Sequence, residues 1–273
     1  MKSPALLTTE DVTPRSHFAL YWTFAHAWVL AKRRLTQIPR RPDELLIATI
    51  QPTMLVLLFR YVFGGAILVP GTSYANYLMA GVFVLASLIS SLATGIGLAT
   101  DLQHGLIDRF RSLPMAHSAV LTGRTLADLV RDVFVVLVIW AVGLLVGFRP
   151  AGNPLAWIAA TGFLLLTTFA FSWLAILLGL VLSSPEAVQG ASLVIFYPLL
   201  FGSNAFVPTS TMPGWLRAFA DHQPISVVMS AVRGLLLNQP DAAAIGQALA
   251  WCVGLLVIFI PLAAWAYGRR TAQ

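Results

Sequence analysis

Long apolar stretches without any charged residue alternate with short polar segments along this chain of 273 residues. Forty residues without Asp, Glu, Lys or Arg separate Arg60 from Asp101, and similar stretches cover 150–185, 187–216 and 242–268. About 20 apolar residues in a helix cross a bilayer, and lipid offers no partner to free backbone groups. We therefore predict an all-α membrane protein with six transmembrane helices, at residues 45–63, 76–100, 128–148, 155–182, 187–207 and 244–267.

The composition agrees with a membrane protein. Hydrophobic residues make up 58% of the chain and charged residues only 10%, whereas a soluble domain has about 25% charged residues. Cys252 is the single cysteine, so an intrachain disulfide and a cysteine-based metal site are both excluded. The first seventeen residues contain no short apolar core, so we expect no cleaved signal sequence.

The basic residues predict the orientation of the spans. With six spans both termini share one side, which would carry thirteen Lys and Arg residues against three on the other side. The positive-inside rule then places both termini in the cytoplasm. The same distribution explains the net charge of +6 without any nucleic-acid partner. Arg60 falls within the first span, and we expect its side chain to reach the outer headgroups rather than to bind substrate.

Shorter elements are predicted on both sides of the membrane. Residues 17–31 are aromatic and apolar and precede three basic residues, a pattern typical of a helix lying in the inner interface. Residues 208–240 predict two short external helices between spans five and six, the first starting at Thr211-Met212-Pro213. We divide the chain into a cytosolic tail with the interfacial helix, 1–42, and a single transmembrane domain, 43–273.

Two energy sources can be tested against the sequence. A nucleotide-binding P-loop requires Gly-x4-Gly-Lys-Ser/Thr, and neither Lys2 nor Lys32, the only lysines, has that context. Any ATPase must therefore lie on another chain. Ion-coupled carriers usually keep acidic residues within their spans. We expect none in the middle of a span here, because Asp128 and Asp132 are placed at the inner end of span three.

The segment 101–117, between spans two and three, has the pattern of a docking element. Leu106, Ile107, Phe110 and Leu113 form an apolar stripe beside charged residues, which suits a helix inserted into the groove of a partner protein. An amphipathic loop resting on lipid has the same pattern and stays an alternative. Asp101, His104 and Asp108 share one helical face and could hold a metal or act as a base, but a solvated face is the preferred interpretation.

Two motifs resemble a known family. G-L-I-D-R-F-R-S-L-P-M at 105–115 is similar to the cytosolic coupling region of type 2 ABC transporter permeases. S-N-A-F-V-P-T-S-T-M-P-G-W-L at 203–216 and H-Q-P-I-S-V-V-M-S-A-V-R-G-L at 222–235 resemble the daunorubicin/doxorubicin-resistance branch of drug exporters. Many family members have a Glu where this chain has Gln103, and Asp101 or Asp108 could replace that Glu. The residues that the resemblance implies for ATPase coupling are Gly105, Leu106, Asp108, Arg109, Phe110, Arg111, Leu113 and Pro114.

The resemblance also implies function and partners. It predicts the permease subunit of an ATP-driven exporter in a bacterial plasma membrane, moving a hydrophobic or amphipathic drug, antibiotic or complex lipid. Two cytosolic ATP-binding subunits would hold ATP and Mg, and a second permease, identical or homologous, would complete the transporter. This chain would need no cofactor of its own. An ion-coupled multidrug carrier and a membrane-embedded lipid-modifying enzyme that uses His104 and Asp108 are the alternatives.

The substrate path is expected alongside spans two and five. Small and hydroxyl-bearing residues also let helices approach closely in lipid, so helix packing is an equally good explanation for this set. The candidate residues are Ser87, Ser90, Ser91, Phe196, Tyr197, Ser203 and Asn204.

Overall fold

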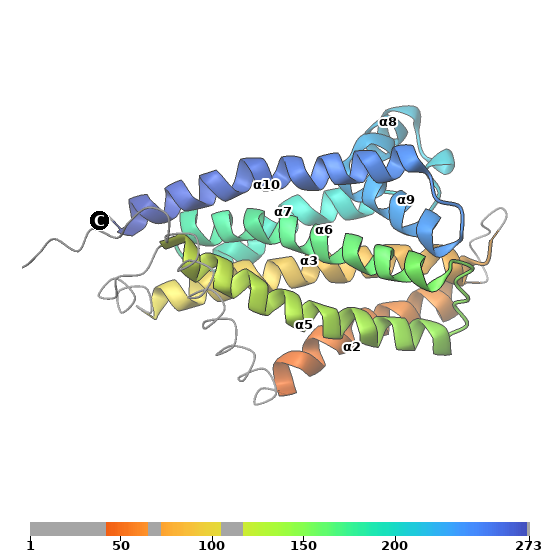
Figure 1. Cartoon of the computed structure of the whole chain (residues 1–273), viewed down its shortest axis with the longest axis horizontal. Helices are drawn as coiled ribbons and strands as arrows, with labels where there is room; N and C mark the ends of the chain where they lie inside the picture. Colours follow the sequence, from red (N-terminus) through yellow and green to blue (C-terminus); the bar gives the residue numbers. More distant parts are fainter. Residues whose placement is uncertain (1–41, 65–71, 105–116, 272–273) are drawn as a thin grey trace, which may run out of the picture.

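The computed structural model describes residues 42–64, 72–104 and 117–271, and these residues form one elongated helical bundle without strands (Figure 1). The all-α prediction is therefore confirmed for this part of the chain. The elements, in chain order, are α2 (Pro42–Leu58), the π-helix η3 (Phe59–Phe63), α3 (Tyr74–Gln103), α5 (His117–Leu145), α6 (Pro154–Val181), α7 (Pro185–Phe201), the 3-10 turn η4 (Thr209–Thr211), α8 (Gly214–His222), α9 (Pro224–Leu236) and α10 (Ala242–Thr271).

The two ends of the bundle differ in what they contain. α3 ends, α5 begins and α10 ends at one end, called here the C-terminal end, whereas α8 and α9 lie at the opposite end (Figure 1). At the C-terminal end, Arg270 Nη1 donates to the carbonyl of Leu180 at 3.0 Å. At the α8/α9 end, the backbone N–H of Arg149 donates to Oδ1 of Asn76 at 3.0 Å. The first bond connects the ends of α10 and α6, and the second connects the residues after α5 to the start of α3.

Local sequence explains where several helices begin. Oγ of Ser73 accepts from the backbone N–H of Asn76 at the start of α3. Oδ1 of Asn153 does the same for α6 and Oγ of Ser184 for α7, each followed by a proline at the first helical position. A side-chain acceptor satisfies a free N–H, and proline has no N–H to satisfy. The polar breaks between apolar stretches thus act as helix starts.

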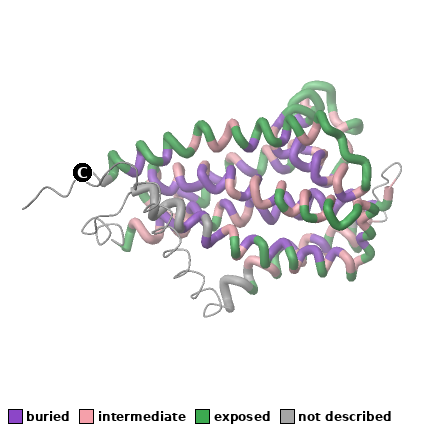
Figure 2. Tube along the Cα trace, in the orientation of Figure 1, coloured by how far each residue is buried: buried purple, intermediate pink, exposed green. Residues whose placement is uncertain are grey.

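α3 lies at the centre of the bundle and α10 at its edge. Most of α3 is buried against the other helices, whereas most of α10 is exposed (Figure 2). α3 packs closely on α6 because both lack side chains at the crossing. A Cβ on Gly95 would lie 2.5 Å from the carbonyl oxygen of Ala175, and one on Gly179 would lie 2.8 Å from that of Gly95. Small residues allow such close approach of helices in lipid.

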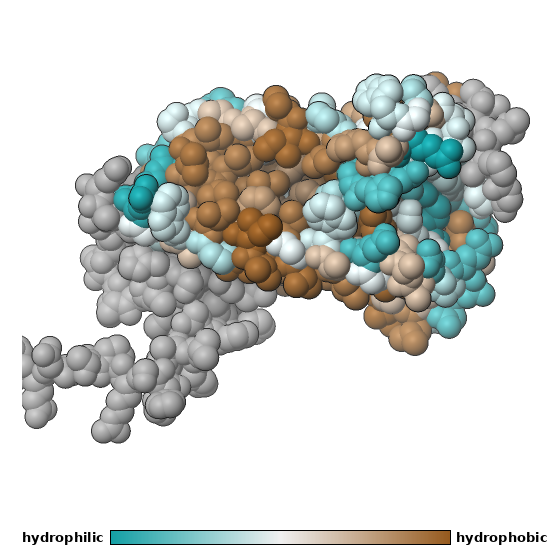
Figure 3. Space-filling model, turned by 90° about the horizontal axis from the view of Figure 1, so that it is seen from above, coloured by the Kyte–Doolittle hydropathy of each residue, from teal (hydrophilic) through white to brown (hydrophobic). Residues whose placement is uncertain are grey.

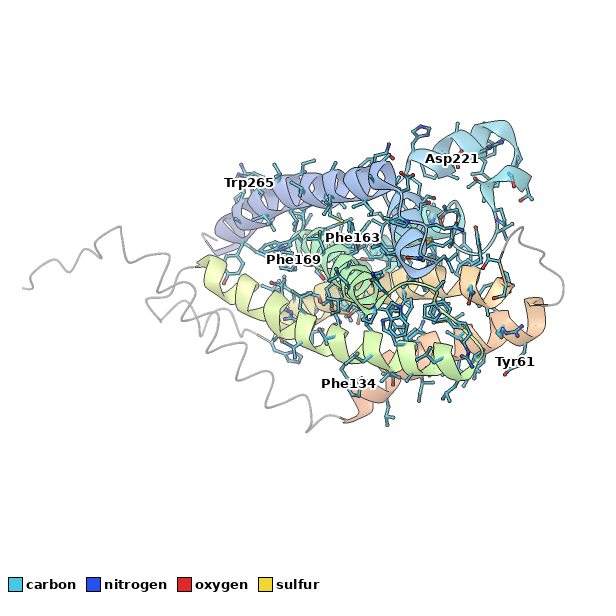
Figure 4. All side chains as sticks on the ribbon, turned by 45° about the vertical axis from the view of Figure 1, so that its right-hand side comes forward. Tyr61, Phe134, Phe163, Phe169, Asp221 and Trp265 are labelled. Atoms are coloured by element: carbon cyan, nitrogen blue, oxygen red, sulfur yellow. The ribbon has the colours of Figure 1, made fainter. Side chains whose placement is uncertain are left out.

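The surface fits a membrane environment. A hydrophobic band separates two more hydrophilic ends on the face shown in Figure 3. Tyr61, Phe134 and Trp265 are exposed on the outside of the bundle (Figure 4). In the described part of the chain, α3, α6 and α10 are long and apolar enough to cross a bilayer, and shorter apolar helices accompany them. The protein is thus membrane-embedded, while the full six-span layout stays a prediction.

Two helices differ in length from the predicted spans, and the predicted end of span five is wrong. α7 ends at Phe201 instead of 207, so Ser203 and Asn204 lie in the turn that follows it. Pro198 has no N–H to donate, and the N–H of Gly202 bonds to the carbonyl of Pro198 as the helix stops. α5 begins at His117, eleven residues before the predicted start of span three at 128, so the helix is longer than the predicted span.

The segment between α7 and α10 contains the two short helices that the sequence predicts. α9 buries Ile225, Val228 and Val232, which recur at helical spacing. α8 starts later than predicted, at Gly214, and Thr211 ends the 3-10 turn η4 instead of capping the helix. Trp215 on α8 is exposed, and Asp221 of the same helix lies at the α8/α9 end (Figure 4).

Candidate functional site

The predicted coupling residues lie outside the part of the chain that the structure describes. Gly105, Leu106, Asp108, Arg109, Phe110, Arg111, Leu113 and Pro114 all belong to the segment 105–116. Their role therefore stays a prediction. The structure does describe the two helices that this segment joins, α3 before it and α5 after it.

Charged side chains connect α3 and α5 next to this segment. Arg124 of α5 forms an ion pair with Asp101 of α3. Asp128 has its carboxylate 3.9 Å from Arg124 and 3.7 Å from Arg131, and it accepts a 2.8 Å hydrogen bond from Thr94 of α3. We call the set Ser90, Thr94, Asp101, Arg124, Asp128, Arg131 and Asp132 the α3/α5 ion-pair network.

The network continues far along α5. Oγ of Ser90 donates to Asp132, and Nη2 of Arg131 lies 2.7 Å from the same hydroxyl and 3.2 Å from the carboxylate of Asp132. Asp132 is 13 residues before the end of α5 at Leu145. That separation is about 20 Å at 1.5 Å per residue, within a hydrocarbon layer of roughly 30 Å.

This depth corrects the placement made from the sequence. Asp132 does not lie at the inner end of a span, because its partner Ser90 sits near the midpoint of α3, 16 residues after Tyr74 and 13 before Gln103. The sequence shows a run of charges after position 123 but not which of them pair across helices. Buried charges are costly unless they are paired and hydrogen-bonded. Here Asp128 and Asp132 each have a guanidinium and a hydroxyl beside them, and Asp101 has the guanidinium of Arg124.

Gly97 makes room for this network. A Cβ at Gly97 would lie 2.1 Å from Nη2 of Arg124. The guanidinium of Arg124 therefore lies over the bare backbone of α3, where it reaches Asp101 one turn further along. A glycine at this position leaves room for the guanidinium of Arg124 where it pairs with Asp101.

The predicted substrate-path residues of α3 have separate surroundings. Ser87 is buried and its hydroxyl donates to the carbonyl of Phe83 on the same helix. Ser91 is buried and donates to Ser87 and to the carbonyl of Thr168 on α6. Ser90 belongs to the α3/α5 ion-pair network. Two of the three serines are thus engaged in helix packing.

The predicted substrate-path residues of α7 and of the turn after it also have different surroundings. Phe196 is buried edge-on against Phe171 of α6, with ring centroids 5.7 Å apart. Tyr197 is 51% exposed on the outside of the bundle. Ser203 is buried, and its Oγ accepts from the N–H of Ala205. The role of these residues in a substrate path stays a prediction.

Asn204 belongs to a polar cluster that sequence reasoning missed. The backbone carbonyl of Asn204 accepts from the hydroxyl of Tyr77 at 2.8 Å and from Nη2 of Arg233 at 2.9 Å. Cζ of Arg233 lies 3.7 Å from the centre of the Tyr77 ring. Asn204 further donates to Ser226 and Ser230 on α9. We call Tyr77, Asn204, Ser226, Ser230 and Arg233 the Arg233 cluster.

The sequence marks only one member of this cluster as unusual. Arg233 is the single charged residue between Asp221 and Asp241 in an otherwise apolar helix, which marks it as unusual. Its partners are 29 and 156 positions away in sequence, so no spacing rule could identify them. Close packing brings them together, since a Cβ at Gly81 on α3 would lie 2.4 Å from the carbonyl oxygen of Ala205.

The alternative sites have ordinary surroundings where the structure describes them. Nδ1 of His104 lies 2.8 Å from the carbonyl of Thr100, one turn back on α3. Asp101 is engaged by Arg124, and Asp108 lies outside the described residues. Within the described ranges there is no group of three or more His, Cys, Asp or Glu arranged to hold a metal. Arg60 is near the α8/α9 end, where Nε lies 3.4 Å from the carbonyl of Val146.

Comparison with known proteins agrees with the family resemblance. Residues 25–237 match the family model described as ABC-2 type transporter. The chain is 36% identical over 260 residues to "Daunorubicin resistance ABC transporter permease protein DrrB1" of Streptomyces coeruleorubidus, covering 95% of this chain and 90% of that protein. It is 26% identical over 265 residues to "Probable doxorubicin resistance ABC transporter permease protein DrrC" of Mycobacterium tuberculosis, covering 95% and 94%. The "Putative transport permease ycf38" of Porphyra purpurea is 28% identical over 217 residues, 77% of this chain and 73% of that protein.

Proposed function

This chain belongs to the ABC-2 type transporter family, and from that premise we propose that it carries hydrophobic or amphipathic compounds out of a bacterial cell. It is the membrane subunit of an ABC exporter, and family membership implies partnership with ATP-binding subunits. We propose two such subunits, which bind ATP and Mg, and a second permease, identical or homologous. The observation that carries the proposal is the match to resistance permeases along 95% of the chain.

The proposed orientation places the C-terminal end of the bundle in the cytoplasm. The excess of Lys and Arg on that side supports it. α8 and α9 are then external, and the segment 105–116 faces the cytosolic ATPase. The proposed division into a tail, 1–42, and a permease domain, 43–273, follows the same orientation.

The proposed mechanism transmits motion through α3 and α5. ATP binding closes the ATPase dimer, the segment 105–116 moves with the groove that holds it, and the two permeases rock around a path between them. The α3/α5 ion-pair network supports this route because it connects α3 and α5, the two helices that the segment joins. Asp101 and Arg124 form the pair nearest to the segment.

The substrate path is proposed between the two permeases, alongside α3 and α7. The exposed ring of Tyr197, which meets Phe201 edge-on at 5.9 Å, gives α7 an aromatic face that an aromatic or apolar compound could contact. Ser87, Ser90, Ser91 and Phe196 are directed into the bundle instead. For those residues, packing accounts for the contacts in this structure.

Reconstitution tests the proposal. ATP hydrolysis by the ATP-binding partner subunit is measured in nanodiscs with and without the chain, across a panel of drugs and lipids. We expect co-purification and hydrolysis that cargo stimulates. Asp108→Arg and Leu113→Asp are expected to abolish transport while leaving membrane insertion intact. Arg217→Gln, in an exposed ion pair on α8, is the matched control. Normal transport by both docking variants contradicts the docking model.

One observation favours the ion-coupled carrier. Asp132 lies at a depth where carriers keep acidic residues, contrary to the placement made from sequence. Its ion pair with Arg131 at 3.2 Å gives it a structural role instead. Transport by proteoliposomes that contain this chain and no ATPase would establish the carrier.

A further inference from the structure

Arg233 is a charged residue for which the described chain provides only neutral partners. Its guanidinium donates to the Asn204 carbonyl at 2.9 Å and stacks on the Tyr77 ring at 3.7 Å. Nε is buried and has no hydrogen-bond partner among the described residues. Arginine has five N–H donors and always carries its charge, so these contacts leave much of its binding capacity unused.

The nearest acidic residues in the sequence are engaged elsewhere. Asp221 pairs with Arg217 at 3.5 Å on the exposed surface of α8. Oδ1 of Asp241 accepts from the N–H of Ala243 at the start of α10. The segment 65–71, which precedes α3, contains no Asp or Glu. None of the ion pairs found in the described residues includes Arg233.

The Asn204 side chain has a second unused group in the same cluster. Its Nδ2 donates to Oγ of Ser230 at 2.8 Å, while its Oδ1 is buried without a partner. Oxygen and nitrogen of an amide are assigned from the hydrogen-bond network rather than observed. With the amide turned over, Ser230 donates to the oxygen, and the free group becomes an N–H2 donor. In that orientation Nε of Arg233 and the Asn204 amide are both unused donors of the same cluster.

The depth of the cluster indicates the source of that acceptor. Tyr77 is three residues from the first residue of α3, which is about 5 Å along the helix. The cluster therefore lies near the end of a membrane-crossing helix, at the level of lipid headgroups. Guanidinium binds phosphate oxygens through strong, often bidentate hydrogen bonds.

We propose that the Arg233 cluster is a binding site for a phosphate oxyanion, supplied by the headgroup of an anionic phospholipid, with Arg233 as its anchor. The site is independent of the export function proposed above. A free phosphate ion has the same chemistry, and the experiment separates these two sources. The alternative without any ligand is a purely structural clasp, in which Arg233 only holds α9 to α3 through Asn204 and Tyr77.

Native mass spectrometry of the full-length chain, released from mixed micelles of phosphatidylcholine and phosphatidylglycerol, tests the site. We expect the wild type to retain phosphatidylglycerol in preference. Arg233→Gln should weaken this retention about tenfold, the equivalent of one charge-assisted hydrogen bond. Arg233→Lys keeps the charge and should retain part of it. Arg217→Gln, which removes an exposed arginine of the same end, should retain lipid as the wild type does.

Two further measurements separate ligand binding from a structural clasp. Tyr77→Phe removes a hydrogen bond to the Asn204 carbonyl but keeps the charge of Arg233, so it should lower the melting temperature and weaken lipid retention less than Arg233→Gln does. Inorganic phosphate titrated into protein in phosphatidylcholine alone identifies the free ion as the source, if it binds the wild type and not Arg233→Gln. Equal retention by the wild type and Arg233→Gln, with no phosphate binding by either, overturns the proposal.

Discussion

Two regions along α3 hold arginine in opposite ways. Toward the C-terminal end, Arg124 and Arg131 of α5 are surrounded by Asp101, Asp128 and Asp132. At the α8/α9 end, Arg233 meets a backbone carbonyl and an aromatic ring but no described carboxylate. Arginine is therefore paired with carboxylates of the chain in the first region, and it has no carboxylate partner among the described residues in the second.

This difference separates two uses of a charge in a membrane protein. Desolvating an ion costs several kcal/mol, and a well-placed partner offsets that cost. The α3/α5 ion-pair network is compensated within the chain, which suits a rigid connection between helices. The Arg233 cluster is not, which suits recognition of something outside the chain. The two regions should therefore respond differently to loss of a single charge.

The largest effect is expected for Asp128→Ala. This change leaves Arg124 and Arg131 with one carboxylate fewer, and removing one member of a buried pair costs about 3–5 kcal/mol. Thermal unfolding of the purified chain in nanodiscs measures the loss. Asp221→Ala is the matched control. The side chains of Asp221 and Arg217 are 41% and 55% exposed, so their ion pair should contribute at most about 1 kcal/mol. Equal losses would show that the network is not stabilising.

Arg124→Gln and Arg233→Gln compare the two regions directly. Arg124→Gln leaves Asp101 and Asp128 without a guanidinium that each now contacts, so we expect a loss of about 3 kcal/mol. Arg233→Gln leaves no carboxylate behind and should lose about 1 kcal/mol, mainly from one hydrogen bond and the ring contact. The same unfolding assay, in phosphatidylcholine nanodiscs, measures both. A larger loss for Arg233→Gln would remove the distinction drawn between the regions.

Gly97→Ala tests the network without removing any charge. The added methyl group would occupy the position of Nη2 of Arg124, which must move away from Asp101. We expect a loss of about 1–2 kcal/mol, since a buried polar group then loses a partner. Gly254→Ala on α10, where a Cβ meets nothing within 4 Å, should gain about 0.5–1 kcal/mol from helix propensity. Stabilisation by both would mean that Arg124 does not depend on Gly97.

The smallest effect is expected for Tyr77→Phe. It removes one hydrogen bond to the Asn204 carbonyl, which Arg233 still occupies, so the loss should be about 0.5–1 kcal/mol. Tyr197→Phe is the control, because that ring lies on the exposed face of α7, and its stability should not change. A loss above that of Asp128→Ala would make the Arg233 cluster the main structural connection of α3.

The sequence predicts the helices better than it predicts their contacts. Charge-free stretches identify α3, α6 and α10 because the apolar length of a span is a local property. The start of α5 lies before the predicted span because the sequence ahead of position 128, with Arg124, is not a continuous apolar stretch. The end of α7 was missed because a proline can lie within a helix, and the sequence does not show that this helix ends three residues after Pro198. Tyr77, Asn204 and Arg233 meet only through folding, so their cluster has no sequence pattern.

Photo-crosslinking tests the docking of the segment 105–116 most directly. A photo-reactive amino acid replaces Leu113, within the predicted docking stripe, or Trp215, which is 76% exposed at the opposite end of the bundle. Both variants are expressed with the ATP-binding partner subunit and irradiated in membranes. The account predicts that the ATPase is captured from position 113 and not from position 215. Capture from neither position, or from 215 alone, would contradict it.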